Sequence, residues 1–241
     1  MAEMIKVTVN GKQIEVAYDT QLLQACREAG ANVPTICHNE NLKPYGVCRI
    51  CSVEINEGHK TRIVPSCVYT VRKPVTVETD TPRIHKHRAM LLNLLLARTP
   101  DVEYVKKLAA EYGVTAPHER FKKKDVDCIL CGMCVQTCRD VVGVAAISFE
   151  GRGATRRVRP PFDKENEMCI ACGACAYVCP TQCIDFTDEQ GTRYLRRWHR
   201  EAPMIECDKC GRYWLPDAFQ AVFNKKMGID PATLTTCPHC R

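Results

Sequence analysis

Apolar and polar residues alternate in four short runs within the first 80 residues, and each run predicts a β-strand. Asn10–Gly11 separates the first two runs and is typical of a tight hairpin turn. A helical pattern occupies residues 21–29, between the second and third runs. This order of strands, helix and further strands predicts a β-grasp domain over residues 1–80. The four predicted strands are residues 5–9, 13–17, 51–55 and 75–79.

Residues 81–124 change to a helical pattern. Thr81 and Pro82 are typical of a helix cap and first turn, and a strongly apolar run follows them. A second amphipathic helix is predicted over residues 101–113. The charged run Lys122–Lys124 predicts a solvated linker. We therefore expect this stretch to be a helical spacer between two domains.

A cysteine pattern occurs twice within residues 125–187, each time with the spacing C-x2-C-x2-C-x3-C. Bacterial ferredoxins with two [4Fe–4S] clusters have this spacing, and the fourth cysteine of each run binds the other run's cluster. The crossing has a geometric reason, because three closely spaced thiolates wrap one side of a cluster and leave the fourth corner facing away. The predicted ligands are Cys128, Cys131, Cys134 and Cys179 for the first cluster, and Cys138, Cys169, Cys172 and Cys175 for the second.

The residues around these runs agree with a ferredoxin-like domain over residues 125–187. Gly132 and Gly173 occupy equivalent positions, where a Cβ atom would crowd a cluster. The apolar segments 144–150 and 183–187 follow the two runs and predict the paired short strands of a ferredoxin repeat. A pair of zinc knuckles is the alternative, but zinc sites usually join two separated C-x2-C pairs instead of one run of three cysteines.

The predicted β-grasp domain contains four more cysteines in the pattern C-x10-C-x2-C-x15-C. Plant-type ferredoxins hold a [2Fe–2S] cluster with C-x4-C-x2-C and a distant fourth cysteine, so the first gap here is longer. A zinc site or four unrelated thiols are the alternatives. His38 adjoins Cys37 and suggests a Rieske-type site, in which two histidines replace two cysteines. Such a site needs a second histidine beside Cys48 and Cys51, and none is present there. The predicted [2Fe–2S] ligands are Cys37, Cys48, Cys51 and Cys67.

Two separated C-x2-C pairs lie within residues 204–241, and a predicted helix over residues 217–229 stands between them. This is the usual arrangement of a structural zinc site with four thiolates, and it predicts a zinc-ribbon-like domain. Such a short segment cannot fold on a hydrophobic core alone, so a metal would supply the missing stability. A further iron–sulfur cluster is the rival to zinc. The predicted ligands are Cys207, Cys210, Cys237 and Cys240.

Residues 188–203 combine four arginines with Trp198, a composition that can contact nucleic acid. Beside a redox domain, a solvated basic linker or a partner-docking surface is the preferred interpretation. The formal charge of +6 supports this choice, because each oxidised cluster with four thiolates carries about −2 and three clusters would offset the excess. We expect no nucleic-acid partner. The four arginines are Arg193, Arg196, Arg197 and Arg200.

The 241 residues include 18 cysteines, most of them in metal-ligand spacings, which favours a reducing compartment over a disulfide framework. The chain opens directly on a strand pattern, so no leader peptide is expected. The longest apolar run, residues 89–97, is too short to span a membrane. A cytoplasmic protein of mixed α+β class, without a transmembrane segment, is therefore predicted.

Residues 34–55 (PTICHNENLKPYGVCRICSVEI) and 127–154 (DCILCGMCVQTCRDVVGVAAISFEGRGA) resemble a known family of iron–sulfur subunits. They are similar to the N-terminal region of the large iron–sulfur subunit of NADH:quinone oxidoreductase and to the diaphorase small subunit of NAD-linked hydrogenases. The resemblance covers residues 1 to about 187 without the spacer. In that family the helix leads into a His-x3-Cys-x2-Cys-x5-Cys site for another [4Fe–4S] cluster. Residues 97–105 here contain neither cysteine nor histidine, so we expect that cluster to be missing.

The resemblance implies an electron-transfer subunit of a cytoplasmic oxidoreductase. Its partners would be a flavin- and NAD(H)-binding subunit like the diaphorase large subunit, and a catalytic hydrogenase, dehydrogenase or other reductase subunit. No P-loop, dinucleotide fingerprint or nucleophile–base motif is visible, so the chain is expected to carry electrons without a substrate site of its own. The alternatives are a free-standing soluble polyferredoxin and a zinc-stabilised binding module for nucleic acid or protein.

Overall fold

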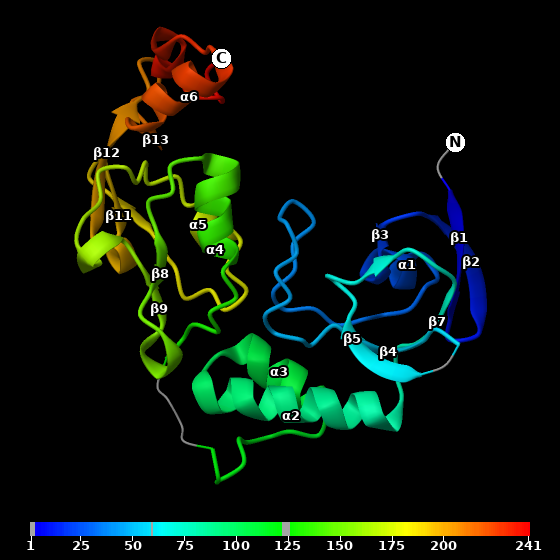
Figure 1. The fold of residues 1–241 in the computed structure, drawn as a ribbon. Coiled ribbons are helices and arrows are strands. Elements are labelled where there is room, and N and C mark those ends of the chain that lie inside the picture. The colour runs from blue at the N-terminus through cyan, green and yellow to red at the C-terminus, as the bar shows by residue number, and fades with distance from the viewer. Residues whose placement is uncertain (1–2, 59, 122–125) are drawn as a thin grey trace. The chain divides into compact units, whose positions relative to one another are not determined.

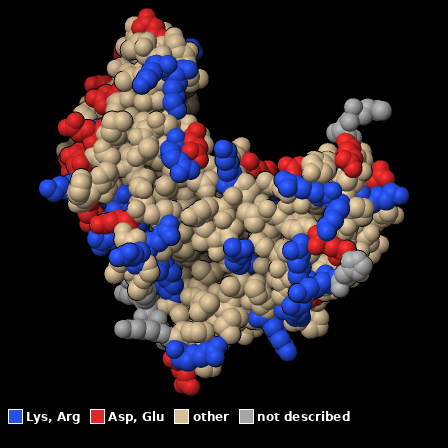
Figure 2. Space-filling view, in the orientation of Figure 1, with Lys and Arg blue, Asp and Glu red and all other residues tan. Residues whose placement is uncertain are grey.

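The computed structural model of the protein describes residues 3–58, 60–121 and 126–241. These residues divide into two compact units, Met1–Cys131 and Gly132–Arg241, both of mixed α+β structure (Figure 1). The predicted linker residues Lys122–Lys124 lie outside the described residues. On the face drawn in Figure 2, Lys and Arg side chains are spread over both units with Asp and Glu among them.

The first unit is built on a five-stranded sheet in the order β2-β1-β7-β4-β5. β1 and β2 form the predicted hairpin, in which Val9 pairs with Lys12 and both residues between them have positive φ. β7 is parallel to β1 and antiparallel to β4, and β5 is antiparallel to β4. A separate pair joins β3 to β6. The strands are β1 (Met4–Val9), β2 (Lys12–Ala17), β3 (Thr20–Gln21), β4 (Ser52–Asn56), β5 (Thr61–Pro65), β6 (Thr70–Val71) and β7 (Val75–Glu78).

The alternating pattern of these strands puts their apolar residues in one core with helix α1 (Leu22–Glu28). Val7 and Val77 of the sheet and Leu22 of the helix are fully buried. Cys26 is also fully buried in this core, where desolvation raises the pKa of its thiol to about 12. It therefore packs as a small apolar residue, apart from the metal-ligand spacings.

Two helices follow the sheet, as the pattern of residues 81–124 predicts: α2 (Pro82–Arg98) and α3 (Glu103–Glu111). Thr81 caps α2, since its hydroxyl oxygen accepts a hydrogen bond from the Ile84 N–H at 3.1 Å. No helix in the described part of the chain is both long and apolar enough to cross a membrane.

The second unit begins with short elements and loops that contain Cys134, Cys138 and the second cysteine run, and continues into a four-stranded sheet in the order β10-β11-β12-β13. β8 pairs with β9, and β10 pairs with β11. The elements are α4 (Met133–Gln136), the π-helical turn η1 (Thr137–Val142), β8 (Ser148–Glu150), η2 (Gly153–Thr155), β9 (Arg157–Arg159), η3 (Pro161–Asp163), α5 (Ala174–Tyr177), β10 (Thr187–Glu189), β11 (Thr192–Leu195), η4 (Arg196–Trp198), β12 (Arg200–Glu206), β13 (Tyr213–Pro216), α6 (Phe219–Met227) and η5 (Pro231–Thr235).

Two expectations for this unit differ from the structure. The segments 144–150 and 183–187 do not supply strands that pair with each other, because each one leads into a hairpin with the strand that follows it. Residues 188–203, predicted as a linker, belong instead to the sheet: β11 lies wholly within them and β12 begins there. The predicted helix between the last two cysteine pairs is present as α6.

Candidate metal centres

The four predicted [2Fe–2S] ligands lie at one end of the sheet of the first unit. Cys37 and Cys48 belong to the loop between α1 and β4, Cys51 directly precedes β4, and Cys67 follows β5. All are buried or half-buried. A hydrogen bond with Cys51 and burial raise the pKa of Cys67, and the negative charges of Cys51, Cys37 and Cys48 raise it further, so the four sulfurs lie in one neighbourhood.

Hydrogen bonds between sulfurs set the proton affinities of this group. The Cys37 thiol lowers the pKa of Cys48 to about 6, and the Cys67 thiol lowers that of Cys51 to about 7. The Cys48 N–H also donates to Cys37 Sγ at 3.4 Å. The same hydrogen bonds raise the pKa of Cys37 and Cys67, so within each pair one thiol is held close to the thiolate form that binds a metal and its partner keeps the proton.

The loop around these cysteines is held in place by contacts that cannot be predicted from the sequence pattern. Gly46 has a φ of +66°, and a Cβ atom there would lie 3.0 Å from Val68 Cγ1, so this glycine lets the loop cross the residue next to Cys67. The Ser66 hydroxyl donates to the Cys51 carbonyl at 2.8 Å. The Tyr104 hydroxyl of α3 donates to the Thr35 carbonyl at 3.1 Å, so the spacer helices also support the loop.

Arg88 of α2 is the main link between the spacer and this loop. Its side chain is 2% exposed, and its guanidinium donates to the carbonyls of Ile50 (3.1 Å), Ser52 (2.9 Å) and Thr79 (3.1 Å) and to the Tyr112 hydroxyl (3.0 Å). Ile50 and Ser52 flank Cys51, so the helix fixes the backbone on both sides of a predicted ligand.

The two ferredoxin-type runs have matching local backbone. Leu130 (φ +57°) and Gly132 (φ +79°) in the first run correspond to Ala171 (φ +54°) and Gly173 (φ +74°) in the second. A short helix, α4 or α5, follows each pair. The repeat that is visible in the spacing is therefore also present in the conformation of the chain.

The structure gives a further reason for Gly173. A Cβ atom there would lie 2.8 Å from Cε1 of Phe186, so an aromatic ring of the same unit also approaches this position closely. The positive φ alone already disfavours another residue. The predicted crowding against a cluster stays a prediction.

Cys138, Cys169, Cys172 and Cys175 line one cavity in the second unit. Cys138 comes from the first run and the other three come from the second, so the fold brings together the set that the crossed pattern predicts. Apolar residues complete the wall: Val142, Val144, Ala146, Ile147, Ile170, Leu195 and Trp198.

Burial dominates the proton affinities in this cavity. It raises the pKa of Cys169 and Cys172, and it raises that of Cys175 to about 12. The Ala146 N–H donates to Cys138 Sγ at 3.2 Å, and the Trp198 Nε1–H donates to Cys175 Sγ at 3.4 Å. The site is thus an apolar enclosure with N–H donors aimed at two of its sulfurs, which suits a buried anionic group.

The other ferredoxin-type set is distributed over both units. Cys128 and Cys131 end the first unit, whereas Cys134 and Cys179 belong to the second, and their assignment to one cluster stays a prediction. The Cys183 thiol lies 3.5 Å from Cys179 Sγ, and its hydrogen bond lowers the pKa of Cys179 to about 5. Cys183 therefore contacts a predicted ligand directly.

The last four cysteines form a much tighter group. The Sγ atoms of all four lie within 4.8 Å of one another, and those of Cys210 and Cys237 are 3.8 Å apart. The Cys237 N–H donates to Cys207 Sγ at 3.3 Å and lowers the pKa of Cys207 to about 6. His239 is outside this group. The arrangement can hold one metal ion between four sulfurs.

The comparisons with known proteins agree with this geometry. The profile of the 2Fe-2S iron-sulfur cluster binding domain matches residues 2–82, and that of the 4Fe-4S dicluster domain matches residues 127–183. The chain carries both of these iron–sulfur domains.

Several similar proteins are subunits of NADH-quinone or NADH-ubiquinone oxidoreductases. The chain is 30% identical over 173 residues to an NADH-quinone oxidoreductase subunit of Rickettsia bellii, and 32% identical over 175 residues to the corresponding subunit of Rhizobium meliloti. It is 29% identical over 174 residues to the mitochondrial 78 kDa subunit of NADH-ubiquinone oxidoreductase of Neurospora crassa. It is a distant homologue of these subunits.

The homology is partial in length. Each of these three alignments covers 62% of this chain but only 20–25% of the relative, so the chain spans about a quarter of the curated relatives or less. A chain in the crystal structure of an NAD+-reducing [NiFe]-hydrogenase is also similar, with a TM-score of 0.57 and 26% identity over 65% of this chain and 75% of that chain. The predicted resemblance to both groups of subunits is confirmed.

Proposed function

We propose that this chain is the electron-transfer subunit of a multi-subunit oxidoreductase. A β-grasp domain would hold one [2Fe–2S] cluster on Cys37, Cys48, Cys51 and Cys67. The dicluster domain would hold two [4Fe–4S] clusters, on Cys128, Cys131, Cys134 and Cys179 and on Cys138, Cys169, Cys172 and Cys175. The complex would be cytoplasmic, because its cysteines in metal-ligand spacings need a reducing compartment.

The observation that carries the proposal is the cavity lined by Cys138 and the three cysteines of the second run. A zinc knuckle would draw its ligands from two C-x2-C pairs, whereas this cavity joins one complete triplet to a single distant cysteine. When bound, such clusters accept and release single electrons. The residues of this chain hold them with thiolates, exclude water with apolar walls and donate N–H groups to the sulfurs.

The C-terminal group is proposed to bind a zinc ion in a zinc-ribbon-like domain. A tetrahedral ion with Zn–S bonds near 2.3 Å places its sulfurs about 3.8 Å apart. The 3.8 Å between Cys210 and Cys237 agrees with that spacing. A [4Fe–4S] cluster puts iron and sulfide between the thiolates and would need the four sulfurs farther apart, so a single ion is favoured over a further cluster.

The proposed partners follow from the relatives. Their names describe subunits of NADH-quinone oxidoreductases and an NAD+-reducing hydrogenase. We propose that one partner binds flavin and NAD(H), like the diaphorase large subunit, and that a second partner is a catalytic hydrogenase, dehydrogenase or reductase. The chain would relay electrons between them without a substrate site of its own.

Anaerobic purification from the native host, followed by metal, sulfide and flavin analysis, tests this function. The expected result is a brown complex with a flavoprotein partner, in which this chain itself accounts for about ten irons and one zinc. About fourteen irons without zinc would reassign the C-terminal group to a cluster. A chain that elutes alone would favour a free-standing polyferredoxin. A colourless protein with zinc and no sulfide would refute electron transfer and favour a binding module.

The crossed assignment predicts the effect of Cys179→Ser. We expect loss of the cluster on Cys128, Cys131 and Cys134, because serine replaces its fourth thiolate, while the cluster on the second triplet remains. Electron paramagnetic resonance of the reduced protein and iron counting measure this. The matched control is Cys183→Ser, which removes the thiol 3.5 Å away and should leave both clusters in place. If Cys179→Ser instead removes the second cluster, the crossed assignment is wrong.

A further inference from the structure

The residues that follow the dicluster domain cover one of its proposed cluster sites. The family profile ends at residue 183, yet Leu195 and Trp198 both line the cavity of Cys138, Cys169, Cys172 and Cys175. Trp198 is 2% exposed and stands in η4, between β11 and β12. Its Nε1–H donates to Cys175 Sγ at 3.4 Å. A residue beyond the dicluster domain thus makes a direct polar contact with a proposed ligand.

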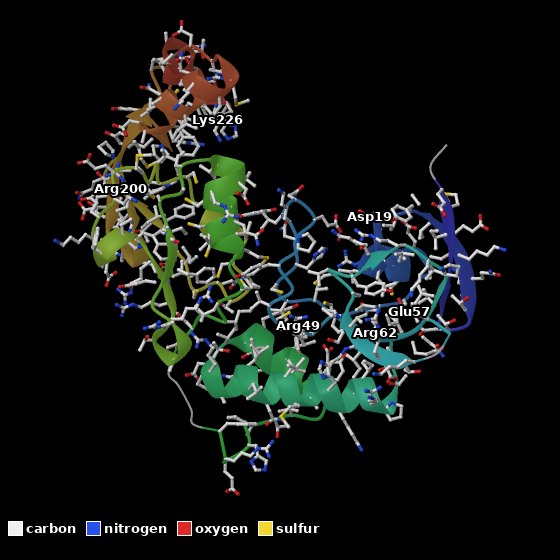
Figure 3. The ribbon with its side chains drawn as sticks, in the orientation of Figure 1. Asp19, Arg49, Glu57, Arg62, Arg200 and Lys226 are labelled. Atoms are coloured by element: carbon white, nitrogen blue, oxygen red, sulfur yellow. The ribbon has the colours of Figure 1, made fainter. Side chains whose placement is uncertain are left out.

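Two arginines of the same sheet hold the backbone of the ligand loop. Arg200 Nε, at the start of β12, donates to the Cys169 carbonyl at 2.8 Å, and Arg193 Nη1 of β11 donates to the Ala171 carbonyl at 3.4 Å. Their side chains are 14% and 12% exposed. Arg200 is labelled in Figure 3, where it lies among the strands and loops of the second unit.

Each arginine is also paired with a carboxylate. Arg200 forms an ion pair with Glu165 at 2.9 Å, and Arg193 forms one with Asp188 at 2.7 Å. Both carboxylates are more exposed than their arginines, at 50% and 38%. Each pair therefore presents its guanidinium N–H groups to the ligand loop, while solvent screens its more exposed carboxylate.

The contacts of Trp198, Arg193 and Arg200 change how favourable an additional negative charge is in this cavity. A cluster gains one negative charge when it is reduced, and N–H donors to its sulfurs and nearby cations favour the more negative state. Exclusion of water works in the opposite direction, because burial disfavours the additional charge. The tryptophan and the two arginines offset that cost at the cavity that Leu195 of β11 and Trp198 of η4 line.

We propose that Trp198 is a positioning residue for the second [4Fe–4S] cluster and raises its reduction potential. The segment 192–200 acts with it as a cover that is anchored to the ligand loop by Arg193 and Arg200. This inference rests on the proposed function, since it requires a cluster in this cavity. It assigns to residues 188–203 a role in the redox domain, where the sequence pattern predicts a linker.

The test is Trp198→Phe in the full chain, which keeps a buried aromatic ring and removes the N–H donor. We expect the midpoint potential of one [4Fe–4S] cluster to fall, with a roughly threefold to tenfold lower equilibrium constant for reduction, or about 30–59 mV for a one-electron couple. The other [4Fe–4S] cluster, the [2Fe–2S] cluster and the iron content should be unchanged. Potentiometric titration monitored by electron paramagnetic resonance measures each cluster separately.

Trp214→Phe is the matched control. Trp214 lies in β13 of the same unit, and in the described part of the chain its buried Nε1 has no hydrogen-bond partner. The same substitution there should leave all potentials unchanged. Arg200→Gln serves as a second variant, because it keeps an amide donor but removes the charge, and it should lower the same potential.

The outcomes separate this inference from the proposed function. A wild-type chain without [4Fe–4S] clusters would refute the function itself. Two clusters in the wild type with potentials that Trp198→Phe does not move would overturn only the role of Trp198, and potentials that Arg200→Gln does not move would overturn the role of its sheet. An equal fall in the midpoint potentials of both [4Fe–4S] clusters would also overturn the role of Trp198, because Trp198 contacts the ligands of only one cluster. If Trp198→Phe loses iron, Arg200→Gln decides: an unshifted potential refutes the inference and a lowered one supports it.

Discussion

Replacing Arg88 with methionine is expected to destabilise the first unit by about 3–5 kcal/mol. The guanidinium is buried and donates to three backbone carbonyls and one hydroxyl. Methionine fills most of the volume but donates nothing, so the carbonyls of Ile50, Ser52 and Thr79 would remain buried without this donor. Arg88→Lys should lose less, because it keeps the charge but a single ammonium cannot reproduce the planar fork.

Hydrogen exchange of the β4 and β7 amides in the full chain measures this free energy within the first unit and does not require that a cluster be bound. Lys86→Met is the matched control, since it removes a positive charge from an exposed position of the same helix and should change stability by less than about 0.5 kcal/mol. Equal exchange rates in the two variants would show that Arg88 is not the link between α2 and the ligand loop.

A second consequence concerns iron binding. The contacted carbonyls of Ile50 and Ser52 flank Cys51, so a chain that loses Arg88 also loses the fixed backbone of this predicted ligand. The spacer is therefore part of the first unit and shapes its cysteine loop. The helices that carry no predicted cluster ligand still have a function, which is to keep the loop of the proposed [2Fe–2S] site in place.

The sequence predicts best where one residue type determines local structure. Asn10–Gly11 specifies the hairpin, and Thr81 and Pro82 begin α2. These signals lie within a few residues of one another, and they need no information about distant contacts. The core position of Cys26 follows equally well from its place on the apolar face of α1.

The sequence predicts poorly where short strands depend on distant partners. β11 has four residues, and its pattern contains one buried position, Leu195. Arginines fill the surrounding positions and resemble a solvated linker, although Arg193 and Arg200 in fact donate to carbonyls of the cysteine loop. In the sequence, the signal for these contacts is the combination of several arginines with Trp198. The groups that they contact can be identified only from the structure, in which the sheet lies beside the cysteine loop.

Arg88 illustrates the same limit. It stands in the basic start of α2, where a charged residue normally indicates a solvated face, yet it is buried. The carbonyls that accept its hydrogen bonds belong to Ile50, Ser52 and Thr79, which lie 38, 36 and 9 residues before Arg88 in the chain. Periodicity within one helix cannot reveal a partner of that kind, because the partner is a backbone group with no residue-type signature.

Loss of the metal from the C-terminal group is expected to unfold residues 207–241 as a whole. The described residues after Glu206 include few buried ones, namely Cys207, Pro216, Leu234 and Cys237. None of the described residues of α6 is buried, and the ring contact between Phe219 and Phe223 lies within this one helix. Half of the buried positions are therefore predicted metal ligands, and no apolar core is available to replace the metal.

Cys237→Ser removes one of the two buried sulfurs and should abolish metal binding, which contributes about 10–16 kcal/mol in comparable four-ligand zinc sites. We expect the α6 amides to lose their protection from hydrogen exchange and the segment to become sensitive to proteolysis, while β1 and β7 of the first unit stay protected. Addition of a strong zinc chelator to the wild-type chain should have the same effect. His239→Ala, in the loop between Cys237 and Cys240, is the matched control and should keep both the metal and the fold. Protection of α6 that survives both Cys237→Ser and chelation would mean that the segment folds without a metal, and the proposed zinc ion would then have no structural role.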